Sequence, residues 1–219
     1  RTNDSSLVMT SSFSNLVIAG QALMRRDAVG EAVDIGTRHG RSLLPAIDEA
    51  CRSVAGAARE RIVMLSSSPL QAWAREAGLK ALEMTAGVFP VVTETFLGLR
   101  HGPMSFVRSD TLVIALLSSD PLRRLYEQDL LRELRAKRIG YLVGIADISE
   151  PDGLFDAVIP AMAPRLADEL RTPFEIVAAQ LFGYHLSLSR GIDPDNPSPA
   201  GVINRVVQGV TIHPARPAP

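Results

Sequence analysis

Apolar residues recur at helical spacing through the first part of the chain. One such stretch covers residues 13–38, with Ser11 or Ser12 as its expected N-cap, and a second covers residues 42–58. The pattern therefore predicts two helices, separated near residue 40, ahead of the first strand.

Beyond residue 58 the spacing changes to short apolar runs that alternate with helical stretches. The runs predict buried strands over residues 61–65, 89–95, 111–117, 140–146 and 157–160. The other stretches predict helices over residues 69–86, 122–138 and 173–190, the second with a charged, solvated face. This alternation predicts an α/β fold, a doubly wound parallel sheet flanked by helices on both faces.

The ends of the chain differ from this pattern. Residues 193–219 are rich in proline and glycine, and we expect an irregular tail that packs back on the domain around Val202–Val207 and frays after Pro214. The opening residues read as a loop without an initiator methionine, so we expect the chain to begin partway through a longer protein.

Composition narrows the function classes. The 219 residues are 46% hydrophobic, which suits one packed domain of ordinary size. The net charge of −1 gives no general attraction to nucleic acid or to a membrane surface, and no apolar run is long enough to span a membrane. The single cysteine, Cys51, excludes an internal disulfide and favours a cytoplasmic protein. The absence of nucleotide-loop and metal-ligand motifs indicates no cofactor and no metal.

The helix over residues 69–86 carries the strongest candidate for acid–base chemistry. Glu76 and Glu83 lie seven positions apart with Lys80 between them, so the three share one helix face. A salt-bridged solvent face is one explanation of this pattern. The remaining residues are mostly apolar or small, however, and a carboxylate on a packed helix would be desolvated, which suits a general base.

Two loops hold further candidate groups. His101 lies in the sequence RHGP, where it is either an ordinary loop residue or an imidazole held in place to exchange protons near neutral pH. Ser66–Ser68 follow the first strand, where their hydroxyl and backbone N–H groups either cap a helix or cradle a phosphate.

Three segments together resemble the sugar isomerase (SIS) family. They read REAGLKALEMTAG over residues 75–87, FLGLRHGPMSF over 96–106 and DNPSPAGVINRVVQGVTI over 195–212. Within the family they are most similar to the tagatose-6-phosphate ketose/aldose isomerase type, also described as galactosamine-6-phosphate deaminase/isomerase. Proteins of this type carry two SIS domains in tandem, each a flavodoxin-like three-layer sandwich. The resemblance assigns residues 1–58 to the end of a preceding SIS domain with linking helices, 59–192 to an SIS domain and 193–219 to the tail.

The resemblance also implies roles for single residues. By likeness to the isomerase half of glucosamine-6-phosphate synthase, Glu83 is the base that moves a proton between C1 and C2. His101 then assists ring opening and belongs to a neighbouring subunit's active site. The substrate contacts expected from the loops or from the resemblance are Ser11, Ser12, Ser66, Ser67, Ser68, Glu76, Lys80, Arg100, Arg205 and Gln208. Gln208 stands where the synthase carries a lysine.

The sequence therefore favours a phosphosugar isomerase/deaminase acting on a hexose or hexosamine 6-phosphate, such as galactosamine 6-phosphate converted to tagatose 6-phosphate and ammonia. We expect a cytoplasmic homodimer, an isomerase or hydrolase that uses no cofactor and binds neither nucleic acid nor membrane. One alternative is a non-catalytic sugar-phosphate-binding SIS module, and another is a dimerisation scaffold. Isomerase against deaminase, and galacto against gluco stereochemistry, remain open at this point.

Overall fold

A five-stranded parallel sheet in the order β2-β1-β3-β4-β5 forms the centre of the computed structural model, which describes residues 6–58, 60–147, 153–207 and 209–213. The strands are β1 Arg61–Ser66, β2 Val91–Glu94, β3 Thr111–Leu116, β4 Tyr141–Ala146 and β5 Ala157–Pro160. Every neighbouring pair is parallel. The predicted doubly wound sheet is confirmed.

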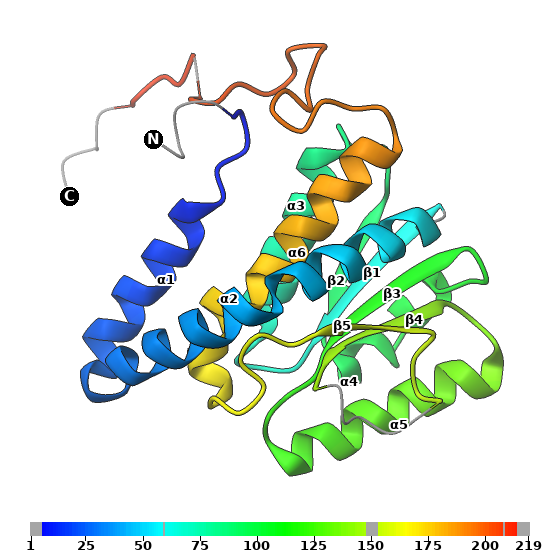
Figure 1. The fold of residues 1–219 in the computed structure, drawn as a ribbon. Helices are drawn as coiled ribbons and strands as arrows, with labels where there is room; N and C mark the ends of the chain where they lie inside the picture. Colours follow the sequence, from blue (N-terminus) through cyan, green and yellow to red (C-terminus); the bar gives the residue numbers. More distant parts are fainter. Residues whose placement is uncertain (1–5, 59, 148–152, 208, 214–219) are drawn as a thin grey trace, which may run out of the picture.

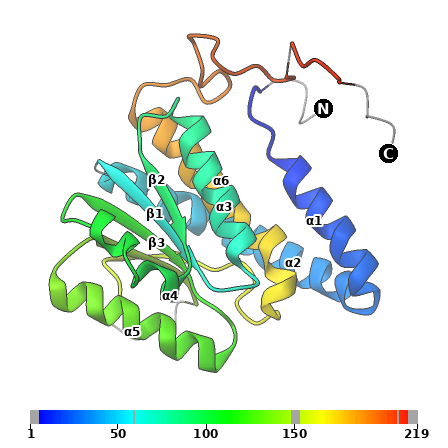
Figure 2. The same cartoon turned by 180° about the vertical axis from the view of Figure 1, so that it is seen from behind.

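Helices cover both faces of the sheet (Figure 1). On one face lie α2, α3 and α6, and on the other lie α4, α5 and a short 3-10 helix, η1. In the view from behind, α1 stands beside α6, farther from the sheet than the other helices (Figure 2). The helices are α1 Ser11–Met24, α2 Arg26–Ala57, α3 Gln71–Met84, α4 Phe96–Leu99, η1 Pro103–Phe106, α5 Pro121–Lys137 and α6 Asp168–Ser189.

Successive residues of a strand point to opposite faces of the sheet and pack into two separate hydrophobic cores. Ile62 and Met64 of β1 pack toward α2, α3 and α6, whereas Val63 and Leu65 pack toward α5. Because both faces are covered, the strands read as continuous apolar runs, which is why the sequence identified them. Trp73 joins α3 to α6 through its indole N–H, which donates to the Glu175 carbonyl at 3.0 Å.

The division of the first two helices differs from the prediction. The break falls at Arg25, and α2 continues through residue 40 and through Pro45 to Ala57. Packing explains why: Gly36 and Gly40 are buried against Phe174 and Met162, so this stretch is held as helix by tertiary contacts. The predicted serine cap is also wrong, because Ser11 and Ser12 lie in the first turn of α1 and Thr10 at the N-cap makes no side-chain bond.

Helix α6 begins at Asp168, five residues before the proline that was expected to start it. Pro173 has no N–H to donate to the carbonyl of Glu169, one turn earlier. The side-chain amide of Gln21 donates to that carbonyl at 2.6 Å instead. A contact from α1 therefore satisfies the carbonyl that the proline leaves free.

Residues 202–207 do not pack on the domain as predicted. Val202, Val206 and Val207 are 83%, 72% and 76% exposed, although residues 198–203 pass close to α3. The expected fraying after Pro214 concerns residues outside the described part of the chain. No helix within the described residues is long and apolar enough to cross a membrane.

Substituting Gly36 tests the close approach of α2 to α6. A Cβ on Gly36 would overlap the ring of Phe174, whereas a Cβ on Gly30 of the same helix would meet open space. We expect Gly36→Ala to lower the free energy of unfolding by about 1–3 kcal/mol through overpacking. Gly30→Ala should raise it by up to about 1 kcal/mol because alanine favours the helix. Urea unfolding of both variants measures the difference, and equal effects would contradict the packing described here.

Candidate active site on helix α3

Helix α3 carries a buried lysine between two carboxylates. Lys80 Nζ lies 3.3 Å from Glu76 Oε1 and 2.7 Å from Glu83 Oε2. The Lys80 side chain is 7% exposed, that of Glu76 13% and that of Glu83 29%. The ion pairs that a solvent face would show are therefore present, but this face of the helix is packed.

A glycine on α6 lies at the contact with α3. A Cβ on Gly183 would lie 3.3 Å from Met84 Cγ, a tight contact, and 3.5 Å from the Lys80 carbonyl oxygen, an ordinary one, so α6 packs closely over this part of α3. The covered lysine keeps its ammonium group beside the two glutamates. With little water nearby, opposite charges at these distances attract more strongly than they would in bulk solvent.

The tail runs past the ends of α3 and α6 (Figure 1). Two cavities adjoin this part of α3. One, of about 340 Å³, is lined by Lys80 and Met84 together with residues of α6 and of the segment ahead of α1. The other, of about 410 Å³, is lined by Glu83, the end of α3 and tail residues between 198 and 203. Glu83 thus lines a space large enough for a sugar.

His101 lies in a different place. It is exposed in the turn between α4 and η1, where its backbone N–H donates to the Gly98 carbonyl at 3.1 Å, and it lines neither of the two cavities. Its neighbour Arg100 binds α5, with Nε 3.0 Å from Glu133 Oε2. Within one chain, the structure does not bring His101 or Arg100 into the cavities beside α3.

The serines after β1 take three different positions. Ser66 is fully buried, and its hydroxyl donates to the Leu70 carbonyl at 3.0 Å. Ser67 is half-buried and its hydroxyl lies beside Glu127 of α5, while Ser68 is exposed. Glu127 itself is fully buried, so the face predicted as solvated on α5 does not include it. One signal was available, since Glu127 falls on the helical stripe that continues through Leu130, Leu131 and Leu134.

The remaining predicted contacts lie at the edges of the domain. Ser11 and Ser12 are half-buried at the start of α1, next to Thr10, whose carbonyl accepts from Gln180 of α6 at 3.1 Å. Arg205 is half-buried in the tail. Gln208 lies outside the described residues. The role of each in binding stays a prediction.

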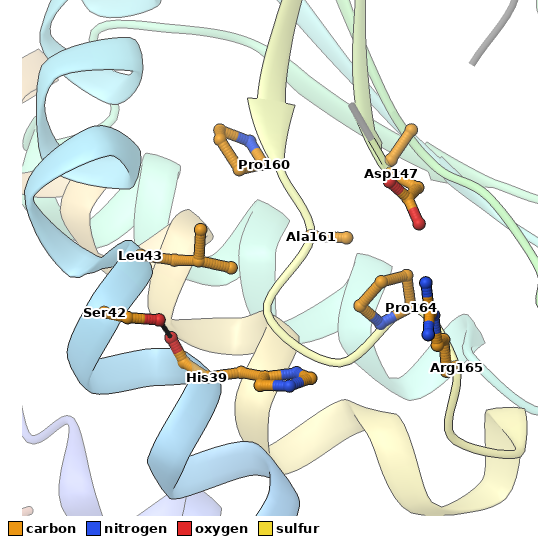
Figure 3. A pocket seen from close by; sticks show the side chains of 9 residues that line it. His39, Ser42, Leu43, Asp147, Pro160, Ala161, Pro164 and Arg165 are labelled. Carbon is orange, nitrogen blue, oxygen red and sulfur yellow. Dashed lines mark hydrogen bonds between the residues drawn. The ribbon is translucent and has the colours of Figure 1, made fainter. Parts of the chain in front are cut away.

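A third cavity, of about 350 Å³, lies beyond the carboxyl ends of β4 and β5 and was not predicted (Figure 3). His39 extends into it from α2, and the side chain of Asp147 points toward Arg165. The sequence position of Asp147 could have indicated this cavity, because Asp147 directly follows a predicted strand and ligands bind beyond the carboxyl ends of such strands. Among the described residues, no three His, Cys, Asp or Glu side chains gather closely enough to hold a metal ion.

Comparison with known proteins places this geometry in context. The chain is 36% identical over 219 residues to D-galactosamine-6-phosphate deaminase AgaS of Escherichia coli, covering 97% of this chain and 56% of that protein. It is 34% identical over 215 residues to the AgaS deaminase of Shewanella sp., covering 97% and 52%. The crystal structure of tagatose-6-phosphate ketose/aldose isomerase from Escherichia coli matches with a TM-score of 0.81 and 31% identity, covering 97% and 56%. No family model matches the chain.

The chain is a homologue of the galactosamine-6-phosphate deaminases. Its sheet and helices form the SIS fold of the phosphosugar isomerases, so the predicted resemblance and fold class are confirmed. The chain spans about half the length of the curated relatives that it matches.

Lys80→Met should leave the Glu76 and Glu83 carboxylates without their shared cation. We expect the free energy of unfolding to fall by about 1–3 kcal/mol, less than for a fully buried pair because both glutamates keep some exposure. Arg52→Met is the matched control, since Arg52 pairs with Asp48 and Glu49 at the same helical spacings on an exposed surface. That variant should change stability by no more than about 0.5 kcal/mol. The free energy of unfolding of both variants is measured by denaturant unfolding. Similar decreases in the two variants would show that burial of the Lys80 ion pairs does not make them more important for stability than exposed ones.

Proposed function

We propose that this chain is the base-bearing part of a phosphosugar isomerase/deaminase that acts on a hexose or hexosamine 6-phosphate. The observation that carries the proposal is the Lys80–Glu83 contact of 2.7 Å between two cavities, with Lys80 lining the one of about 340 Å³ and Glu83 lining the one of about 410 Å³. The homology to galactosamine-6-phosphate deaminases and the fold of a tagatose-6-phosphate isomerase support the same chemistry.

The chemistry needs one carboxylate that both removes and returns a proton. In the open-chain amino sugar, Glu83 takes the proton from C2 and delivers it to C1, which turns the aldehyde and amine into a hydroxymethyl group and a C2 imine. Water then adds to the imine carbon and ammonia leaves, so galactosamine 6-phosphate and water yield tagatose 6-phosphate and ammonia. With a hydroxyl in place of the amine, the same proton transfer converts an aldose into a ketose.

Lys80 and Glu76 support this step without taking part in the proton transfer. The Lys80 ammonium fixes the Glu83 carboxylate in one position, and Glu76 fixes the ammonium from the other side at 3.3 Å. A base held on a rigid, packed helix needs little reorganisation when the proton moves.

Ring opening requires a second acid–base group, and we assign it to His101 of a neighbouring subunit. The assignment is supported by the exposure of His101 and by its absence from the cavities lined by Lys80 and Glu83 in its own chain. It implies a homodimer. The same proposal includes a cytoplasmic location, no cofactor, and sugar contacts from Ser11, Ser12, Arg205 and Gln208.

Glu83→Gln tests the assigned base in the intact protein. Ammonia and sugar product are measured with galactosamine 6-phosphate and, separately, interconversion with tagatose 6-phosphate. We expect kcat to fall by about 10²–10⁴-fold in the variant, because the amide cannot accept the proton. Substrate should still raise the melting temperature. Glu49→Gln, on the exposed side of α2, should leave turnover unchanged, and full activity of Glu83→Gln would refute the proposed role.

A mixing experiment tests the shared site. Glu83→Gln and His101→Asn should each be nearly inactive alone. After unfolding and refolding together, about a quarter of wild-type activity should return, because half the dimers are hybrids and each hybrid holds one intact site. No recovery from a mixture that forms hybrids would place both groups in one chain. A substrate-induced rise in melting temperature with no product from the wild type would instead favour a sugar-phosphate-binding module.

A further inference from the structure

The loops after β1 and β3 leave the sheet at its topological switch point. β1 and β3 are neighbours, with Ser66 opposite Leu116, and the chain continues from β1 to α3 on one face and from β3 to α5 on the other. In open α/β sheets this crevice is the usual place for an anionic ligand. Hydroxyl and N–H donors do gather here, from Ser67, Ser118 and Ser119.

Two carboxylates of the chain itself take these donors. Glu127 Oε2 accepts from the Ser118 N–H at 2.8 Å, and the Ser67 hydroxyl lies beside the same carboxyl group. Asp168, from the first turn of α6, accepts from the Ser119 N–H at 2.8 Å, from the Ser119 hydroxyl at 3.0 Å and from the Ser118 hydroxyl.

Guanidinium groups surround the same point. Arg171 is 1% exposed and donates to the Leu117 carbonyl at 2.7 Å and to Asp168 at 3.2 Å. Arg124 donates to the Ser118 carbonyl at 2.6 and 2.8 Å and attracts the Glu127 carboxylate. Arg123 approaches Asp168 at 3.5 Å. Hydroxyls, backbone N–H groups and arginines are the groups that bind oxyanions in proteins.

The two carboxylates are not equally well satisfied. Burial acts to raise the pKa of Asp168, but hydrogen bonds from Ser118 and Ser119 outweigh it and the pKa is lowered. For Glu127, burial outweighs the bonds from Ser67 and Ser118, and the pKa is raised. Glu127 is 0% exposed, and its Oε1 has no hydrogen-bond partner among the described residues. Asp168 is well satisfied, whereas Glu127 keeps one acceptor oxygen without a donor among the described residues, so Glu127 is the more weakly held of the two carboxylates.

We propose that the switch point of this domain is an oxyanion site whose resident anion is the Glu127 carboxylate. While Glu127 is in place, the site is closed to phosphate. It follows that the Ser66–Ser68 loop, which the sequence offered as a phosphate cradle, does not hold the phosphate of a sugar substrate in the native protein. A variant without the Glu127 side chain would bind inorganic phosphate or a phosphate monoester between Ser67, Ser118 and Arg124.

Removing the resident anion tests the inference. Melting temperatures of the wild type, Glu127→Ala and Glu127→Gln are compared in inorganic phosphate and in chloride at equal ionic strength. We expect phosphate at about ten times its dissociation constant to raise the melting temperature of Glu127→Ala by about 2–4 °C beyond the wild-type response. Glu127→Gln, which removes the charge but keeps the site filled, should respond as the wild type does. Asp129→Ala, on the exposed side of α5, controls for the loss of one negative charge.

Two further measurements keep the test decisive. If Glu127→Ala does not fold, Glu127→Ser replaces it, because its hydroxyl is small enough to leave the site open. In the isotope-labelled wild type, added phosphate should not move the backbone amide signals of Ser67 and Ser118. A folded Glu127→Ala or Glu127→Ser with only the wild-type phosphate response, or movement of those two signals in the wild type, would overturn the inference. None of these results depends on the activity of Glu83, so failure here leaves the proposed function untouched.

Discussion

Close packing of α6 against its two neighbours is the constraint on which the rest of this structure depends. A side chain on Gly36 of α2 would enter the ring of Phe174 of α6, and one on Gly183 of α6 would crowd Met84 of α3. These glycines let α6 pack closely against both α2 and α3, and that packing constrains the rotation of α3. The rotation of α3 in turn decides that Lys80 is covered while Glu83 reaches a cavity. The glycines at these helix contacts thus help to set the position of the candidate base, Glu83.

Buried charge is the second organising feature, and it occurs in two groups of ion-paired side chains. On α3, one ammonium stands between two carboxylates, and at the switch point arginines surround Asp168 and Glu127. Desolvating charges is costly unless each finds partners, so such groups contribute specificity of arrangement more than net stability. The group on α3 borders cavities and is suited to proton transfer. In the group at the switch point, the two carboxylates already accept from the Ser118 and Ser119 backbone N–H groups.

The sequence predicted those parts of the fold that local patterns determine. Strands buried on both faces read as apolar runs, so the range 157–160 was found to the residue, and α3 was placed within two residues. The features that depend on long-range contacts could not be predicted from local sequence patterns. Pro173 reads as a helix start unless the Gln21 contact to Glu169 is known, and the role of Glu127 depends on a serine sixty positions away. The Glu76–Lys80–Glu83 spacing indicated a shared face, but only packing against α6 showed that the face is buried.

The separation of these features bears on how the activity proposed here would arise. A proton shuttle between adjacent carbons works only when the sugar is held within a fraction of an ångström, and the phosphate is the strongest handle for holding it. The proposed base, Glu83, stands on a packed helix, yet Glu127 occupies the switch point and His101 lies outside the cavity that Glu83 lines. The groups that bind the phosphate and the acid that opens the ring would therefore come from a different domain or subunit than the one that carries Glu83. The activity would then require assembly of these units, because folding of this domain alone would not bring an open-chain sugar to Glu83.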